Sequence, residues 1–184
     1  MKFKKPIIVV LGEPYSVFIE IFFKTYQNFI KNNLMSPIIL IGSYELLVKQ
    51  MKYFKYNFKF NLIDKKSIES VRDNKRINVI NVNYKFHRIF EKTNKFSNNY
   101  ISECFKISIK LVENNKVSGI VNGPINKKKF LNKKYLGITE YLAHQTSTKN
   151  ISMLIYNKDF SVSPITTHVP LKKVVSNLTR GKII

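Results

Sequence analysis

The chain has 184 residues, of which 44% are hydrophobic, and it carries a formal net charge of +21. A chain of this length can bury roughly 70% of its unfolded surface in a core, and its one cysteine, Cys104, excludes an internal disulfide and a cysteine-rich zinc site. No apolar run approaches the roughly 20 residues of a membrane-spanning helix, so we expect a cytoplasmic protein with no membrane partner.

The first half of the chain alternates predicted strands and helices. Residues 6–11 form a continuous apolar run that Gly12-Glu13-Pro14 ends, which indicates a buried strand and a turn. Apolar side chains then recur at helical spacing over residues 17–31, which predicts an amphipathic helix with Pro14 in its first turn and Asn32-Asn33 at its end. Further strands are predicted at residues 38–41, 58–63 and 77–82, and helices at residues 43–51, capped by Ser43, and 97–113.

The second half repeats this alternation. A short apolar run within residues 118–127 predicts a buried strand that ends at Gly123-Pro124, and a lysine-rich connection over residues 126–134 follows. A helix is predicted to start at Thr139, and strands are predicted at residues 151–156 and 160–167. Pro170 opens a final helix that continues to Ile184. Strands that alternate with helices favour an α/β fold with parallel strands and right-handed crossovers.

Lysine supplies almost all of the positive charge, since only Arg72, Arg76, Arg88 and Arg180 are arginines. Specific recognition of bases and phosphates favours arginine, so we expect no specific nucleic-acid partner. A basic nucleic-acid binder is kept as an alternative, because steep salt dependence of DNA binding would reveal it. The positive field should also attract small anionic substrates.

His168 is the most informative polar residue, since it follows Thr166 and Thr167 at a predicted strand end. An imidazole there can bind a metal ion or transfer a proton, and a hydrogen-bonded core histidine is the alternative. The start of the helix at Thr139 can bind phosphate through free N–H groups, or it can be an ordinary helix start. We interpret His87 as a structural histidine at or near the surface, and expect a surface hydrogen bond between Glu140 and His144.

The motifs GEP, GIVNGPINK, LGITEY and ITTHVPL, in this order, resemble those of the 4-hydroxythreonine-4-phosphate dehydrogenase family of vitamin B6 biosynthesis. The resemblance spans essentially the whole chain. It implies an α/β fold with a mostly parallel sheet, part of an isocitrate/isopropylmalate-dehydrogenase-like fold. Residues 1–184 would be the N-terminal portion of such a dehydrogenase, with the boundary between its domains left open and the C-terminal portion of the family absent.

The resemblance also implies an activity, namely the NAD-dependent (or NADP-dependent) oxidation and decarboxylation of 4-phosphohydroxythreonine to 3-amino-2-oxopropyl phosphate. It implies a homodimer and a divalent metal ion such as Zn, Mg or Co. His168 matches the first of three metal-binding histidines and would be catalytic, while Thr139 and Lys127 match substrate-binding positions. Ile138 stands where the family usually has a substrate-binding histidine.

Two alternatives to this activity stay open. The chain could be a paralogous dehydrogenase of a related phosphorylated four-carbon acid, which the change at Ile138 favours. It could also be a catalytically inactive phosphate-binding or dimerisation fragment. In either case the abrupt end of the fold predicts an exposed apolar surface and self-association.

Overall fold

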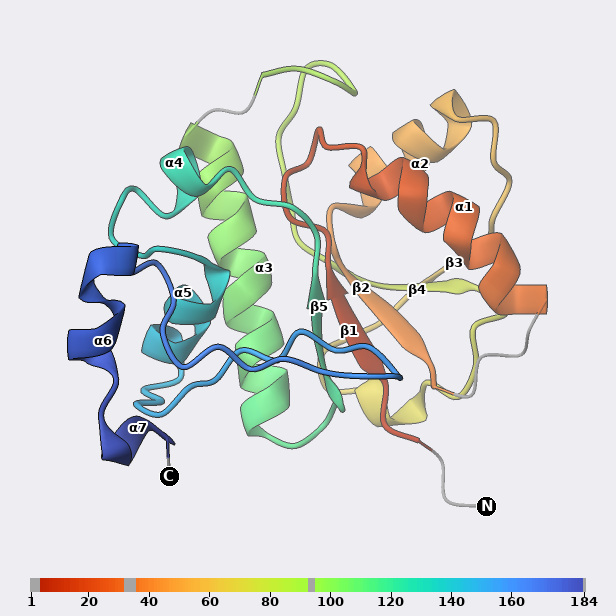
Figure 1. The fold of residues 1–184 in the computed structure, drawn as a ribbon. Helices are drawn as coiled ribbons and strands as arrows, with labels where there is room; N and C mark the ends of the chain where they lie inside the picture. Colours follow the sequence, from red (N-terminus) through yellow and green to blue (C-terminus); the bar gives the residue numbers. More distant parts are fainter. Residues whose placement is uncertain (1–3, 32–35, 93–94, 184) are drawn as a thin grey trace. The chain divides into compact units, whose positions relative to one another are not determined.

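The structure, a computed structural model, describes residues 4–31, 36–92 and 95–183. The chain divides into two compact units, Met1–Asn126 and Lys127–Ile184. The first unit is built on one five-stranded sheet, and the second holds short helices and loops (Figure 1). No helix in the described ranges is long and apolar enough to cross a membrane.

The sheet of the first unit is parallel throughout. Its strands lie in the order β3 (Phe60–Leu62), β4 (Ile77–Asn81), β2 (Ile38–Gly42), β1 (Ile7–Val10) and β5 (Gly119–Asn122). The chain passes from β1 to β2 in one direction and later crosses back from β4 to β5 on the other side of β1. In open α/β sheets such a reversal marks the crevice where ligands bind, at the carboxyl ends of the strands. Here the reversal lies between β1 and β5.

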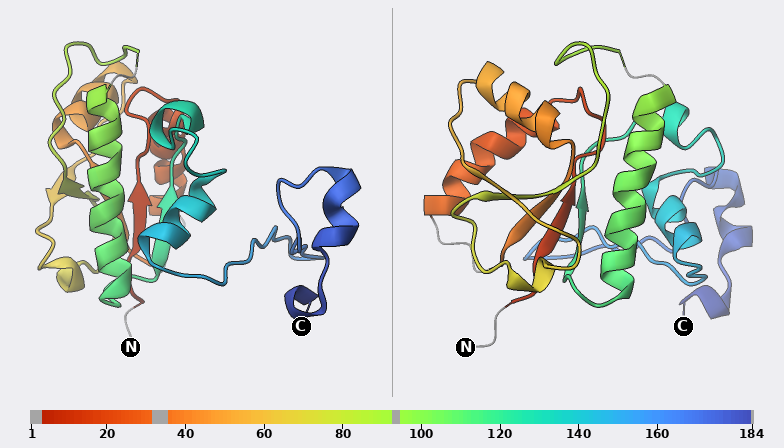
Figure 2. Two further views of the ribbon diagram at one scale, coloured as in Figure 1. Left: turned by 90° about the vertical axis from the view of Figure 1, so that its left-hand side faces the viewer. Right: turned by 180° about the vertical axis from the view of Figure 1, so that it is seen from behind.

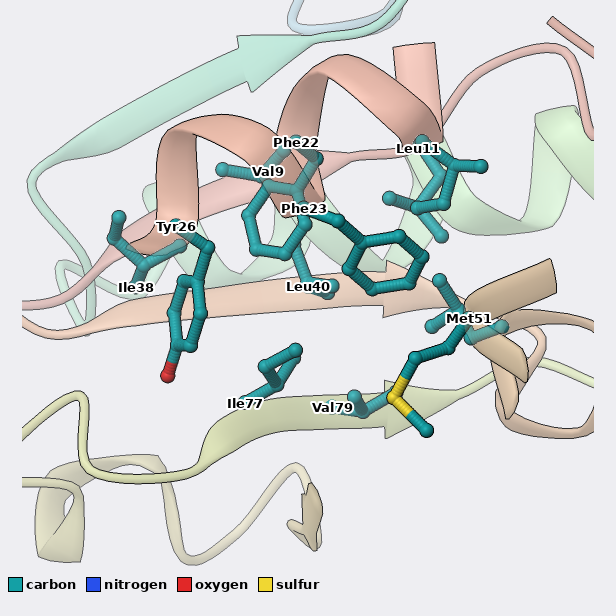
Figure 3. Close-up of a cluster of buried hydrophobic side chains, with 12 residues drawn as sticks. Val9, Leu11, Phe22, Phe23, Tyr26, Ile38, Leu40, Met51, Ile77 and Val79 are labelled. Atoms are coloured by element: carbon teal, nitrogen blue, oxygen red, sulfur yellow. The ribbon is translucent and has the colours of Figure 1, made fainter. Parts of the chain in front are cut away.

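Helices α1 (Phe18–Lys31) and α2 (Tyr44–Tyr53) cover one face of the sheet. Phe22, Phe23 and Tyr26 project from α1 onto the strands, and Phe23 and Tyr26 are almost completely buried (Figure 3). These three residues lie on one side of the helix and form an apolar stripe that faces the core. The repeat predicted over residues 17–31 also included Ile21, which is 52% exposed. The cluster combines Val9, Leu11, Ile19, Phe22, Phe23, Tyr26, Ile38, Leu40, Leu47, Met51, Ile77 and Val79.

Helix α3 (Lys95–Glu113) covers the opposite face and contacts β1, β2 and β5 (Figure 2). Ile101, Cys104, Phe105 and Ser108 are buried on its inner side, in the helix predicted at residues 97–113. Burial raises the pKa of the Cys104 thiol to about 12. Cys104 is therefore a neutral core residue at physiological pH.

The boundaries in the first unit match the predictions with one correction. Ser43 caps α2, with its hydroxyl oxygen 3.4 Å from the Leu46 N–H, as predicted. Pro14 does not lie in the first turn of α1, because the helix starts at Phe18. It is instead the second residue of a turn closed by the Ser16 N–H and the Glu13 carbonyl at 3.2 Å, a position that suits its fixed φ angle. The predicted helix end at Asn32-Asn33 lies outside the described residues.

The second unit departs from the sequence predictions after α5. It contains α4 (Lys127–Phe130) in the lysine-rich connection and α5 (Ile138–Gln145) at the predicted helix. The predicted final helix is broken into η2 (Leu171–Lys173), α6 (Val174–Asn177) and α7 (Arg180–Ile183). Leu171 and Val175, which would share one face of the predicted helix, are 88% and 81% exposed. A helix without a surface to pack against is marginal in water, so one long helix gains little over short turns.

The two strands predicted at residues 151–156 and 160–167 are also wrong. These segments meet only at one antiparallel bridge, in which Ile155 and Val162 exchange hydrogen bonds of 2.8 and 2.9 Å. No described residue outside the pair extends this bridge into a sheet, and an isolated hairpin is marginal in water. The backbone at His168 has φ of +58°, which also ends any extended conformation at that point.

Candidate functional site

The GEP and NGP motifs meet at the carboxyl ends of β1 and β5. The Glu13 N–H donates to the Pro124 carbonyl at 2.8 Å, and the Gly123 N–H donates to the Val10 carbonyl at 2.7 Å. Gly12 has φ of +71°, and a Cβ atom there would overlap the Pro124 carbonyl oxygen. A Cβ at Gly123 would likewise overlap the Leu11 carbonyl oxygen. Both glycines are therefore required for the two loops to approach this closely.

Glu13 ties these two loops together with its side chain. One carboxylate oxygen, Oε1, accepts from the backbone N–H of Asn126 at 3.0 Å. The residue is 9% exposed and also lines a cavity of about 10 Å³ at the same edge of the sheet. From the sequence, GEP indicated a turn after the first strand and formed one motif of the family resemblance, and neither gave a role to Glu13. Its position directly after the first strand was the signal that could have identified it.

A chain of tyrosines links the other loops at this edge. The Tyr15 hydroxyl donates to the Glu91 carboxylate at 2.5 Å, and the Tyr84 hydroxyl donates to Tyr15 at 3.1 Å. The Tyr100 hydroxyl accepts from the Ser43 N–H at 2.9 Å. Burial raises the pKa of Tyr15 and Tyr100 well above the usual tyrosine range, so both stay neutral. These groups act as fixed hydrogen-bonding partners rather than as acids or bases.

Gln50 completes the connection between these loops. Its side chain is 2% exposed, and its amide donates to the carbonyls of Pro14 at 2.9 Å and Ile89 at 3.1 Å. The turn after β1 and the long loop after β4 are thus joined through one buried amide. A rigid carboxyl edge of this kind can present backbone groups to a ligand with little reorganisation.

The second unit contains a hollow of about 560 Å³ that begins at Thr139 on α5. Gly137 is the N-cap of α5 and provides no side-chain cap. The Glu140 carboxylate lies over Gly137, since a Cβ there would be 3.0 Å from Oε2 of Glu140. This carboxylate complements the positive end of the helix and would compete with a bound anion. The hollow is lined by Thr139, Glu140, Lys149, Asn150, Ile151, Ser152, Met153, Ser163, Pro164, Ile165, Thr167 and Gly181.

The structure brings some of the predicted site residues together and leaves others apart. Thr139 lines the hollow, and so does Thr167, the residue next to His168. Lys127 is exposed at the start of α4 and does not line the hollow, and Ile138 is half-buried. The lining residue that sequence reasoning missed is Lys149, whose ammonium group has no salt bridge within the described ranges. In the sequence, the only indication of a role for Lys149 was its position between the helix predicted from Thr139 and the apolar run at residues 151–156.

The histidines occupy exposed positions. His168 is exposed in a loop rather than at the end of a strand. The predicted hydrogen bond between Glu140 and His144 is wrong, because no such bond is formed in the described residues and Nδ1 of His144 lies 3.0 Å from the Tyr135 hydroxyl instead. His87 is exposed, as predicted for a surface histidine. Within residues 4–31, 36–92 and 95–183, no group of three His, Cys, Asp or Glu side chains could hold a metal ion.

Comparisons with known proteins identify relatives along nearly the whole chain. The sequence profile of the family "Pyridoxal phosphate biosynthetic protein PdxA" matches residues 33–184. A 4-hydroxythreonine-4-phosphate dehydrogenase from Sulfurihydrogenibium sp. is 29% identical over 183 residues, which cover 96% of this chain and 53% of the relative. A provisionally named D-threonate 4-phosphate dehydrogenase from Oceanobacillus iheyensis is 28% identical over 187 residues, with 98% and 55% covered.

Solved structures agree on the fold. The crystal structure of a 4-hydroxythreonine-4-phosphate dehydrogenase from Burkholderia phymatum superposes with a TM-score of 0.83 at 20% identity. The match covers 99% of this chain and 56% of that one. The α/β fold with a mostly parallel sheet, predicted from the sequence, is confirmed. The chain spans about half the length of the curated relatives it matches.

Proposed function

Because the chain belongs to the family of pyridoxal phosphate biosynthetic protein PdxA, we propose that it is part of an NAD-dependent dehydrogenase of a small phosphorylated hydroxy acid. The family match over residues 33–184 carries this proposal. The hollow at Thr139 supports it, since about 560 Å³ suffices for a small phosphorylated substrate. The net charge of +21 favours the approach of such an anion.

The proposed substrate is 4-phosphohydroxythreonine. Oxidation transfers a hydride from the carbon that bears the secondary hydroxyl to the nicotinamide of NAD, and the hydroxyl proton is released. The resulting β-keto acid loses carbon dioxide and leaves 3-amino-2-oxopropyl phosphate. NAD, or NADP, supplies the hydride acceptor when bound.

The residues of the hollow provide groups for the phosphoryl end of this substrate. The Thr139 hydroxyl and the free N–H groups of the first turn of α5 can donate to phosphate oxygens. The Lys149 ammonium adds a positive charge to the same hollow. Lys127, at the start of α4 and not in the lining of the hollow, is the second proposed cation for the substrate. Ile138 contributes only apolar surface, so it removes one donor that the resemblance led us to expect.

A divalent metal ion does not fit the described residues alone. Catalytic sites of this kind use about three protein ligands, and His168 has no companions in the part of the chain that the structure describes. A Zn, Mg or Co ion at His168 would therefore need ligands from other polypeptide, and we assign no step to it. We propose a homodimer as the functional assembly, in line with the resemblance.

Binding and turnover test the proposal separately. Calorimetry should detect 4-phosphohydroxythreonine binding to the chain, and Thr139→Val should weaken it at least about tenfold through loss of a charge-assisted hydrogen bond. Oxidation is followed by NADH absorbance with a divalent ion present. Binding without turnover favours the inactive phosphate-binding fragment, whereas no binding by the wild-type chain contradicts the proposed function.

D-threonate 4-phosphate is the second candidate substrate. The relative from Oceanobacillus iheyensis carries that name and is nearly as similar as the 4-hydroxythreonine-4-phosphate dehydrogenase above. The two substrates differ at one carbon, where an ammonium group replaces a hydroxyl. Calorimetry with both compounds distinguishes them, because a dehydrogenase of the paralogous class should bind the threonate more tightly.

A further inference from the structure

Glu13 has a buried carboxylate oxygen that no described residue satisfies. Its residue is 9% exposed, and while Oε1 accepts from Asn126, Oε2 is buried without a hydrogen-bond donor in the described part of the chain. A buried carboxylate oxygen without a donor is costly, because it has lost its hydration and gained nothing in return. The site therefore requires a donor that the described residues do not supply.

The cavity beside Glu13 has the size and polarity for such a donor. Its volume is about 10 Å³, and its polar lining includes Ser16, Ser43, Gln50 and Tyr100. One water molecule needs a cavity of about 10–15 Å³ and two to four polar partners. The Ser16 and Ser43 oxygens accept from backbone N–H groups at 3.3 and 3.4 Å. Neither hydroxyl hydrogen is donated to a described residue, so both are available.

We propose that this cavity binds one internal water molecule, which donates to Oε2 of Glu13 and accepts from the hydroxyl of Ser43 or Ser16. Glu13 is then a positioning residue with both oxygens engaged, one on the loop after β5 and one on the water. Because Asn126 directly precedes Lys127, the carboxylate fixes the backbone where the lysine-rich segment begins.

Water fits this cavity better than a cation. A metal ion takes several oxygen ligands, whereas the cavity offers one carboxylate oxygen and two serine oxygens that already accept hydrogen bonds. Its lining includes the unpartnered Oε2 acceptor of Glu13 and the hydroxyl hydrogens of Ser16 and Ser43. A water molecule can satisfy both kinds of group at once, because it donates and accepts.

A high-resolution crystal structure tests the site directly. We expect density for one water molecule at about 2.7 Å from Oε2 of Glu13, and no anomalous signal there in crystals soaked in rubidium chloride. A rubidium peak at this place, an empty cavity, or a protein group that donates to Oε2 would overturn the proposal.

Glu13→Gln tests the role of the second oxygen in solution. The amide keeps an acceptor for the Asn126 N–H but replaces Oε2 with an NH₂ group that cannot accept from the water. We expect Tm to fall by about 2–4 °C. Glu69→Gln makes the same charge change at an exposed position of the first unit and should leave Tm unchanged. An equal Tm for Glu13→Gln and wild type contradicts the water-bound oxygen.

Glu13→Ala tests the positioning role. It removes the acceptor for the Asn126 N–H together with the water ligand, so we expect hydrogen exchange of that amide to accelerate at least about tenfold. Exchange in Glu13→Gln should stay close to wild type. Unchanged exchange in Glu13→Ala would show that Glu13 does not fix the loop, and would overturn this part of the proposal.

Discussion

The two units of the chain bury their apolar side chains to very different extents. In the first unit, the sheet residues Ile8, Ile39, Leu40 and Ile41 are completely buried between helices on both faces. In the second, the buried apolar residues of the described ranges are Leu131 and Tyr141. Its exposed ones are Leu136, Ile151, Met153, Leu154, Ile155, Tyr156, Phe160, Val162, Ile165, Leu171, Val175, Leu178 and Ile183. Apolar side chains thus form a core only where a sheet provides two faces to cover.

The two units also differ in the hydrogen bonds that join their segments. In the first unit every strand bonds to a neighbour, and buried polar groups such as Gln50 and Asn78 are paired with backbone. In the second, one bridge between Ile155 and Val162 is the only strand-like contact in the described ranges. Apolar side chains on an isolated hairpin stay in water, because no neighbouring strand or helix buries them.

Truncation of a core aromatic should show the largest contrast between the units. Phe23 is completely buried and its ring lies 5.6 Å from Tyr56 and 5.9 Å from Phe58. Phe23→Ala should lower the free energy of unfolding by about 3–5 kcal/mol through the cavity it leaves. Phe160→Ala, at a residue that is 71% exposed, should change it by less than about 0.5 kcal/mol. Urea unfolding monitored by circular dichroism measures both, and similar losses would contradict the contrast.

The second largest loss of stability should come from a substitution at Gly12, where the GEP and NGP loops meet. Gly12→Ala places a side chain at φ of +71° and against the Pro124 carbonyl. We expect a loss of about 2–3 kcal/mol, which combines the strain of a left-handed residue with the displacement of the loop. Gly119→Ala in β5 is the matched control, since nothing lies within 4 Å of the added methyl group. Equal stability of the two variants would show that the loops do not interlock.

The sequence predicted the first unit well because its signals were local. Continuous apolar runs, helical spacing around Phe22 and Tyr26, and the Ser43 cap each specify an element without knowledge of its neighbours. The segments around Ile155 and Val175 carry equally apolar patterns, but a pattern becomes a strand or a helix only when a partner surface buries it. The sequence therefore overestimated order after α5.

Prediction of the candidate site was limited for a related reason. Thr139 lies at a helix start and in a hollow, where the sequence expected a binding residue. Its companion Lys149 could not be predicted, because its place in the hollow depends on how the loop after α5 returns. The Glu13 contact with Asn126 joins positions 113 residues apart and has no local signature. The metal, substrate and cofactor roles assigned from the resemblance stay predictions.

Removal of the negative charge at the start of α5 should change stability less than either substitution in the first unit. It should lower the stability of the second unit and raise its affinity for phosphate. Glu140→Gln should weaken the second unit by about 0.3–1 kcal/mol, because an acidic residue in the first turn stabilises the helix dipole. It should raise the affinity for inorganic phosphate about two- to fivefold, since a competing anion is gone. Calorimetry measures the affinity. Glu113→Gln, in the last turn of α3, is the control and should not change it.

The smallest effect on stability should come from a substitution in the exposed hairpin around Ile155 and Val162. This substitution tests directly whether the hairpin is exposed in solution. Leu154 is 63% exposed, so Leu154→Lys should change the free energy of unfolding by less than about 0.5 kcal/mol. It should nevertheless reduce self-association of the chain, because it breaks the apolar surface and adds charge. Sedimentation velocity over a range of concentrations measures association, and Lys158→Gln, an exposed polar change in the same loop, is the control. If Leu154→Lys destabilises the fold while association is unaffected, the hairpin is packed in solution and the second unit has a core of its own.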